Sequence, residues 1–266
     1  PQNGTACETQ PTKTVVITVQ DVGNPGSIAA SQTICYGATP AALTSVTPGS
    51  GSSSPAYSWE YSTNGGATWI PIGGANGAGY APGALTQTTW YRRITTCTVN
   101  GVNCSAASAY VVITVQGQVI PPSVTANQTI CYNTTPAILN RTNASGGSGS
   151  FTYQWQSSTD NVNFANVGAS GPTYQPPALT VTTYFRVAVT DASCGGPFYS
   201  NVVTITVRAQ LVAPEICCDQ IICTGYSAEP LSIIIPPTGG SGSYSYQWEI
   251  STDNVNWNII PGAVLP

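Results

Sequence analysis

The chain has 266 residues, of which 41% are hydrophobic and only 6% are charged, and it contains neither methionine nor histidine. Its net charge is −4, with one lysine and five scattered arginines, so it lacks the clustered cations that bind nucleic-acid phosphates. The hydrophobic fraction is too high for a disordered linker, and the longest apolar runs are far shorter than the roughly 20 residues that span a bilayer.

In chain order, the first predicted element is a Val-rich strand over residues 13–20. Similar strands recur at 110–116 and 201–207, and each of them closes one repeat unit. The predicted division is the C-terminal strand of a preceding repeat at 1–20, complete immunoglobulin-like repeats at 21–116 and 117–208, and the N-terminal part of a following repeat at 209–266.

An aromatic motif marks the centre of each unit. AYSWEYS, TYQWQSS and SYQWEIS place Trp59, Trp155 and Trp248 at equivalent positions, and the sequence landmarks repeat every 92 to 96 residues. This period matches a β-sandwich domain of about 100 residues and is too long for a solenoid repeat. Large and small or polar residues alternate around each tryptophan, as in a half-buried strand. We therefore expect the three tryptophans to lie in the cores of their units.

The remaining signals are also those of strands and turns. Gly/Ser-rich segments at 48–55 and 145–150 indicate loops, and no stretch has the periodicity of an amphipathic helix. Prolines in the linkers near 116–122 and 208–214 favour extended backbone. The predicted fold is all-β, with tandem immunoglobulin-like β-sandwich domains arranged as an elongated rod.

Nine cysteines indicate an oxidising compartment. The second unit contains Cys131 and Cys194, and a bridge between them is the simplest assignment. In the first unit Cys35 is expected to pair with Cys104, with Cys97 as the alternative partner.

The other cysteines have no such partner within their own unit. Cys7 and Cys223 are expected to pair with residues outside this sequence, and the roles of the vicinal Cys217 and Cys218 stay open. A zinc site would need two spaced pairs of ligands, so no metal is predicted.

Catalytic chemistry is not expected. Without histidine there is no Ser-His-Asp or Cys-His arrangement. Glu60 and Glu249 follow their tryptophans, but the second unit has Gln156 at that position. The Asp160-Asn161 turn resembles part of a calcium loop, yet it supplies too few oxygens and suits a tight hairpin turn better. No enzyme activity and no cofactor are predicted.

Recurring aromatic residues raise the alternative of an array of carbohydrate-binding β-sandwich modules. Trp69, Phe164 and Trp257 recur in phase, as do Trp90 and Tyr184. Such rings could stack on sugars if their faces were exposed. The phenylalanine at the middle position favours apolar packing instead.

The segments TICYGATP, GGSGSFTYQWQSSTDNVNF, LTVTTYFR and SNVVTITV resemble the immunoglobulin-like and PKD-like tandem repeats of giant Bacteroidota cell-surface adhesins, including SprB-type gliding-motility adhesins. The resemblance implies a secreted, type IX-exported, extracellular surface filament with a structural or adhesive role. The implied partners are adjacent repeats of the same long chain and a surface polysaccharide or other adhesion target.

Overall fold

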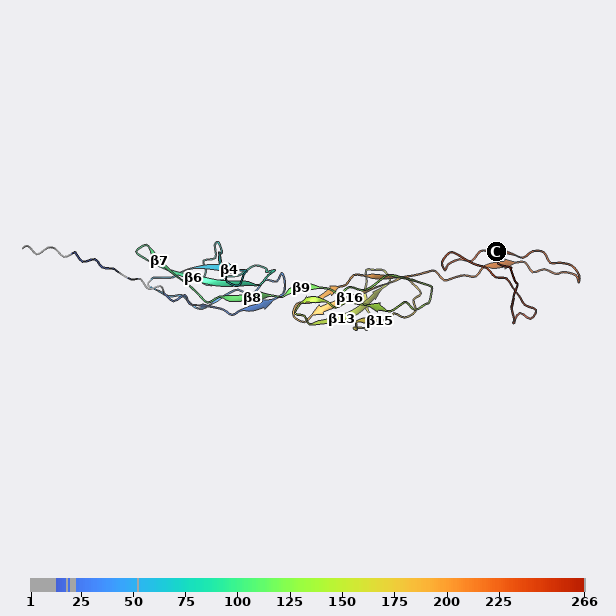
Figure 1. The fold of residues 1–266 in the computed structure, drawn as a ribbon, viewed down its shortest axis with the longest axis horizontal. Helices are drawn as coiled ribbons and strands as arrows, with labels where there is room; N and C mark the ends of the chain where they lie inside the picture. Colours follow the sequence, from blue (N-terminus) through green and yellow to red (C-terminus); the bar gives the residue numbers. More distant parts are fainter. Residues whose placement is uncertain (1–12, 18, 20–22, 52, 266) are drawn as a thin grey trace, which may run out of the picture. The chain divides into compact units, whose positions relative to one another are not determined.

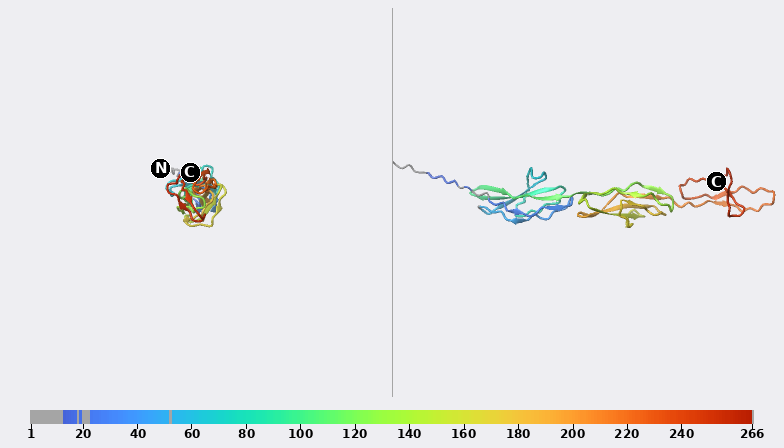
Figure 2. Two further views of the ribbon diagram at one scale, coloured as in Figure 1. Left: turned by 90° about the vertical axis from the view of Figure 1, so that its right-hand side faces the viewer. Right: turned by 60° about the horizontal axis from the view of Figure 1, so that its bottom comes forward.

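The computed structural model describes residues 13–17, 19, 23–51 and 53–265. Strands and loops make up all of these residues, without any helix among them (Figures 1 and 2). The described part of the chain accordingly has no helix that could cross a membrane. The chain divides into two compact units, 1–117 and 118–266. The all-β prediction is confirmed.

One large sheet dominates the first repeat. Its strand order is β2-β8-β6-β4-β5, with β7 beside β6, and β2 runs parallel to β8 while the other pairs are antiparallel. A second pair, β1 (Ser27–Ile28) with β3 (Ser45–Thr47), is separate from this sheet. The strands of the large sheet are β2 (Gln32–Ile34), β4 (Ala56–Ser62), β5 (Ile70–Pro71), β6 (Thr89–Val99), β7 (Val102–Ala107) and β8 (Val111–Val115).

The second repeat has the same topology. Its large sheet has the order β10-β18-β16-β13-β14, with β17 beside β16 and with β10 parallel to β18. Two short pairs are separate from it, β9 (Gly117–Ile120) with β12 (Ser145–Gly147) and β11 (Leu139–Asn140) with β15 (Thr173–Tyr174). The large sheet comprises β10 (Gln128–Ile130), β13 (Phe151–Ser158), β14 (Ala165–Asn166), β16 (Thr183–Asp191), β17 (Gly195–Tyr199) and β18 (Val203–Val207).

Each repeat has its own core between the large sheet and the segments opposite. In β6, every second residue from Thr89 to Cys97 is buried, as the period-two geometry of a strand requires. Trp59 and Trp155 are fully buried. The first core comprises Ile28, Leu43, Trp59, Tyr91, Val111 and Ile113, and the second comprises Val124, Leu139, Trp155, Phe185, Val187, Val203 and Ile205.

The third segment, residues 209–265, forms no large sheet. It has two short pairs, β19 (Glu215–Cys217) with β20 (Ser232–Ile235) and β21 (Glu249–Ile250) with β22 (Asn258–Ile259). Trp248 is only half-buried, unlike its two equivalents. Residues 209–265 provide no counterpart of β6 or β16, the strands that pair with the tryptophan strands in the complete repeats. The core position of Trp248 is therefore only partly covered.

The Val-rich strand predicted at 13–20 does not form over residues 13–17. Val15 and Ile17 are exposed there. A strand is stable only when a neighbouring strand accepts its hydrogen bonds and its apolar face is covered, and this segment lacks that cover. The rest of that prediction, including Cys7, lies outside the described residues.

Candidate functional site

Each tryptophan of the aromatic motif combines apolar packing with one directed hydrogen bond. The indole Nε1 of Trp59 donates to the carbonyl of Gly77 at 3.0 Å, and Trp155 donates to Gly171 at the same distance. Trp248 makes the corresponding bond to Leu265 at 2.8 Å. The only polar atom of a buried indole is thus satisfied. These three residues anchor the loop that follows the motif to the core strand.

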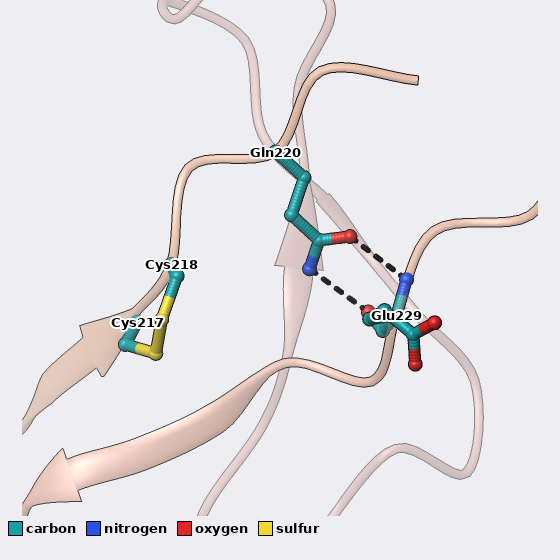
Figure 3. Close-up of a disulfide and its surroundings, with 4 residues drawn as sticks. All are labelled: Cys217, Cys218, Gln220 and Glu229. Atoms are coloured by element: carbon teal, nitrogen blue, oxygen red, sulfur yellow. Dashed lines mark hydrogen bonds between the residues drawn. A yellow bond between two sulfur atoms is a disulfide. The ribbon is translucent and has the colours of Figure 1, made fainter. Parts of the chain in front are cut away.

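A glutamine clamp recurs in all three repeats and was not predicted. The side-chain amide of Gln220 donates from Nε2 to the carbonyl of Glu229 at 3.1 Å and accepts from the Glu229 amide at 2.8 Å (Figure 3). Gln32 makes the same pair of bonds to Ala41, and Gln128 makes it to Ala137. The signal was present in the sequence, since a glutamine stands three residues before each of Cys35, Cys131 and Cys223. The side-chain amide of each glutamine forms the same pair of hydrogen bonds to a backbone residue that a peptide group of a neighbouring antiparallel strand would form.

The Asp160 turn is a hydrogen-bonded hairpin turn. Oδ1 of Asp160 accepts from the Ser158 hydroxyl and from the backbone amides of Val162 and Asn163, at 2.7 to 2.9 Å. Oδ2 accepts from the Asn163 side chain at 2.7 Å. These bonds, led by the one from Ser158, hold the pKa of Asp160 well below its ordinary value. Both carboxylate oxygens are used inside the turn, which leaves little capacity for calcium.

Asn161, at the tip of this turn, has a left-handed φ of 60°, as a tight turn at this position requires. Across the described residues there is no group of three or more His, Cys, Asp or Glu side chains that could hold a metal ion.

Two of the aromatic rings considered for sugar binding, Trp69 and Phe164, are covered by arginines of the same repeat, whereas Trp257 is exposed. The guanidinium of Arg92 lies 4.2 Å from the ring centre of Trp69. In the second repeat Arg186 lies 3.9 Å from the ring centre of Phe164 and 3.8 Å from that of Tyr199. Such cation–π contacts occupy ring faces on which a sugar would otherwise stack.

The two side chains that follow the buried tryptophans support this arrangement. Glu60 forms an ion pair with Arg92, with 2.7 Å between its Oε2 and both Nε and NH2. Gln156 accepts from Nε of Arg186 at 2.9 Å. A carboxylate and an amide therefore perform the same task, which is to orient an arginine.

A buried arginine replaces an apolar residue in the first core. Arg93 is fully buried on β6, where the second repeat has Val187. Its guanidinium donates to carbonyls that include those of Pro25, Thr47 and Ala78, at 3.0 to 3.1 Å. These bonds offset much of the desolvation of the charge and tie the opposite segments to the large sheet, while Nε of Arg93 is buried without a hydrogen-bond partner.

The cysteine pairings differ from those predicted. Cys35 and Cys194 are disulfide-bonded, whereas Cys104 and Cys131 carry free thiols. Cys97 is buried, and its thiol donates to the carbonyl of Ser53 at 3.6 Å. The predicted Cys131–Cys194 and Cys35–Cys104 bridges are therefore wrong, and so is the alternative with Cys97. Cys217 and Cys218 are bonded to each other (Figure 3).

The register of the second repeat explains why Cys131 and Cys194 are apart. Cys131 follows Ile130, which pairs with Val207 at the end of β18. That end of β18 lies beside the start of β16, because Ile205 pairs with Thr183. Cys194 follows Asp191, the last residue of β16. Eight residues of strand at about 3.3 Å each separate these two ends by about 26 Å. Bridged cysteines have Cα atoms within about 7 Å. The two cysteines lie at opposite ends of one sandwich.

A family model described as Domain of unknown function (DUF8696) matches the chain three times, over residues 24–117, 120–209 and 212–265. A sequence comparison with characterised proteins finds no match.

Several solved structures resemble the chain at low identity. Domains A168-A170 from titin are 16% identical, with a TM-score of 0.38 over 70% of this chain and 67% of that one. The N-terminal eight Ig domains of Down Syndrome Cell Adhesion Molecule are 12% identical, with a TM-score of 0.30 over 73% of this chain and 27% of that one. Fibronectin(III)-like modules of Clostridium thermocellum CbhA are 16% identical, with a TM-score of 0.30 over 69% of this chain and 94% of that one.

Proposed function

This chain belongs to the DUF8696 family, and from that premise we propose that it is a structural and adhesive segment of a long extracellular filament on the cell surface. The resemblance of its motifs to giant bacterial surface adhesins extends the proposal to a type IX-exported protein of the gliding-motility kind. Its direct partners would be neighbouring repeats of the same chain, with a surface polysaccharide as the adhesion target.

The observation that carries the proposal is that the features repeated in the chain are the ones that hold a sandwich together. The indole hydrogen bond and the glutamine clamp occur in all three repeats with nearly the same distances. The arginine-supporting position, in contrast, holds Glu60 in one repeat and Gln156 in the next. The features shared by all three repeats are therefore contacts that join strands and loops within one repeat, as expected of structural modules.

The disulfides support the extracellular location. Disulfides persist in oxidising compartments, and Cys35, Cys194, Cys217 and Cys218 are all disulfide-bonded.

Antibodies against this chain provide the test. They should label intact, unpermeabilised cells of the source bacterium, and brief treatment of the cells with an external protease should remove the label. Labelling that requires permeabilisation would contradict the proposal. A glycan array discriminates the carbohydrate-binding alternative, which would gain support if the chain bound a glycan and the Trp69→Ala variant did not.

A further inference from the structure

We propose that the first repeat binds one neutral sugar residue of a surface polysaccharide in a tyrosine-lined cavity beside its core. Tyr61, Tyr80 and Tyr91 line this cavity, which has a volume of about 300 Å³. The cavity itself follows from the geometry of the repeat, whereas the identification of its ligand as part of a polysaccharide rests on the proposed function.

The three tyrosines come from two paired strands and from the segment between β5 and β6. Tyr61 on β4 and Tyr91 on β6 are register partners, so their side chains leave the large sheet on the same face. The ring of Tyr80 lies 5.9 Å from that of Tyr91 and 5.8 Å from that of Trp59. Residues 83–87 line another side of the cavity. Parts of the repeat that are distant in sequence thus bring three phenols to one place.

The hydroxyl of Tyr91 has no hydrogen-bond partner among the residues that the structure describes, although the residue as a whole is only 4% exposed. In this part of the chain, Nε of Arg93 is the one fully enclosed side-chain polar atom without a partner. The Tyr91 hydroxyl is therefore not enclosed, and it opens to the cavity that the residue lines. Because an unpaired hydroxyl in a buried position is unfavourable, a ligand that pairs with it gains affinity.

The second repeat contains the same stack of three rings with a different third member. Trp155, Tyr174 and Phe185 have ring separations of 5.8 and 5.9 Å, as in the first repeat. The registers of the two large sheets put Phe185 at the position of Tyr91. Packing of the stack therefore does not require the Tyr91 hydroxyl, which is available to a ligand.

The polar groups around the cavity favour a neutral, polyhydroxylated ligand. Besides the phenols, the lining includes the side chains of Thr63, Thr86 and Gln87, and no acidic or basic residue of the described chain belongs to it. A charged ligand would lose its hydration there without meeting an opposite charge. The volume lies at the small end of the roughly 300–1,000 Å³ typical of ligand pockets, which suits a single sugar ring.

The protonation state of Tyr91 agrees with this ligand class. Burial, together with the neighbouring phenols of Tyr80 and Tyr61, raises the pKa of Tyr91 to about 12. Its phenol is therefore protonated at neutral pH, and it can both donate and accept a hydrogen bond, as a sugar hydroxyl can.

The first experiment probes the whole chain on an array of neutral oligosaccharides. The oligosaccharide that binds best is then titrated into chain with ¹³C-labelled tyrosine rings and followed by NMR. Signals of Tyr61, Tyr80 and Tyr91 should shift, and that of Tyr174 should not. Absence of binding across the array would overturn the inference. A proline-rich peptide that shifted these signals in place of every oligosaccharide would overturn the assignment to a sugar.

The second experiment removes one oxygen atom. Tyr91→Phe should weaken binding of the same oligosaccharide by at least about tenfold, because a hydrogen bond to a buried group is lost. The thermal midpoint of the first repeat should be retained, since Phe185 packs at the equivalent position. Tyr110→Phe is the matched control, because Tyr110 is exposed in the same repeat and does not line the cavity. Equal affinity of the Tyr91 variant and the parent chain would refute the site.

A second variant covers the case in which Tyr91→Phe fails to fold. Tyr61→Ser introduces the residue that the second repeat has at this position, Ser157, and it should also weaken binding by at least about tenfold. Unchanged binding in this variant would refute the site as well.

Antibody labelling of intact cells tests the proposed function separately. A chain that is labelled on intact cells but binds no oligosaccharide of the array would keep its place in a filament and lose this site. A chain whose binding depends on Tyr91, but which is labelled only after permeabilisation, would keep the sugar site and lose the extracellular filament.

Discussion

Trp155 shows at the scale of one residue how the motif stabilises a repeat. Its indole is fully buried among residues from β11, β16 and β18, and it lies 5.8 Å from the ring of Tyr174. Its single polar atom is bonded to Gly171. Burial of the ring supplies the free energy, and the hydrogen bond fixes where the loop after β14 returns to the core.

Replacing Trp155 with alanine should lower the free energy of unfolding of the second repeat by about 3–5 kcal/mol, the usual loss when a large buried aromatic residue is removed. Urea-dependent hydrogen exchange in peptides from residues 118–208 measures this loss. Val162→Ala is the control, because Val162 is exposed at a turn and its truncation should change stability by less than about 0.5 kcal/mol. Equal effects of both substitutions would contradict the assigned core.

Asp160 predicts a specific response to acid. Because its pKa in the folded protein lies below the unfolded value of about 3.9, its ionised form stabilises the folded state. This contribution is complete above about pH 5 and is lost as the pH falls through the range between the two values. In the Asp160→Asn variant the thermal midpoint of the second repeat should depend less on pH between 5 and 2.

The first repeat provides a natural model for that variant. Asn64 occupies the equivalent position, and its Oδ1 accepts from the Ser62 hydroxyl and the Thr68 amide. Asp160→Asn should therefore retain most of the stability at pH 7, and Asp160→Ala should not. A variant with asparagine that keeps the full acid dependence of the parent would show that another group is responsible.

Individual residues were predictable from the sequence to different degrees. Trp155 could be placed because alternation and repetition both indicate an inward position on a strand. Arg93 could not, since a charged residue is normally assigned to the outer face, and only the carbonyls contributed by distant segments make its burial possible.

At the scale of the elements, the first strand of each repeat is attached at two places. β10 pairs in parallel with β18, and its first residue, Gln128, also clamps Ala137. The clamp extends a three-residue strand that would otherwise have few bonds of its own. It therefore joins the edge of the large sheet to the segment leading into β11.

Replacing Gln128 with alanine should remove both bonds and cost about 1 kcal/mol, near the lower end for two hydrogen bonds because the site is solvent-exposed. The specific readout is the amide of Ala137, whose hydrogen exchange followed by NMR should accelerate more than that of amides in β16. Thr129→Ala is the control, since Thr129 is exposed beside the clamp and should leave this amide unchanged. Unchanged hydrogen exchange at the Ala137 amide in the Gln128 variant would mean that the clamp does not stabilise this segment.

Strand partners and disulfides were harder to predict than the strands themselves. The period-two pattern around Val203 indicates a strand but not that its neighbour is the parallel β10, because pairing depends on residues about 75 positions away. The same dependence on residues far apart in the sequence explains the error at Cys131 and Cys194. Their membership in one repeat was clear from the sequence, while their placement at opposite ends follows from the register of β16 and β18.

At the scale of the whole molecule, the complete repeats have separate cores. The core cluster of the first repeat lies within residues 28–113 and that of the second within 124–205, and the two share no residue. Each core is also closed by strands of its own repeat. Each complete repeat therefore contains what a cooperative folding unit needs.

Two equivalent leucines allow this independence to be measured. Leu43 and Leu139 are both fully buried. Leu43 pairs with Tyr80 and Leu139 with Tyr174, and each tyrosine contacts the core tryptophan of its repeat. Truncation of either leucine to alanine should cost about 2–5 kcal/mol in its own repeat. In scanning calorimetry, Leu43→Ala should lower only one unfolding transition and Leu139→Ala only another. The double variant should show both shifts with their single-variant sizes, because the sites share no partners. If either substitution moved both transitions together, the repeats would form one cooperative unit, and the array would resist force as a block instead of yielding one repeat at a time.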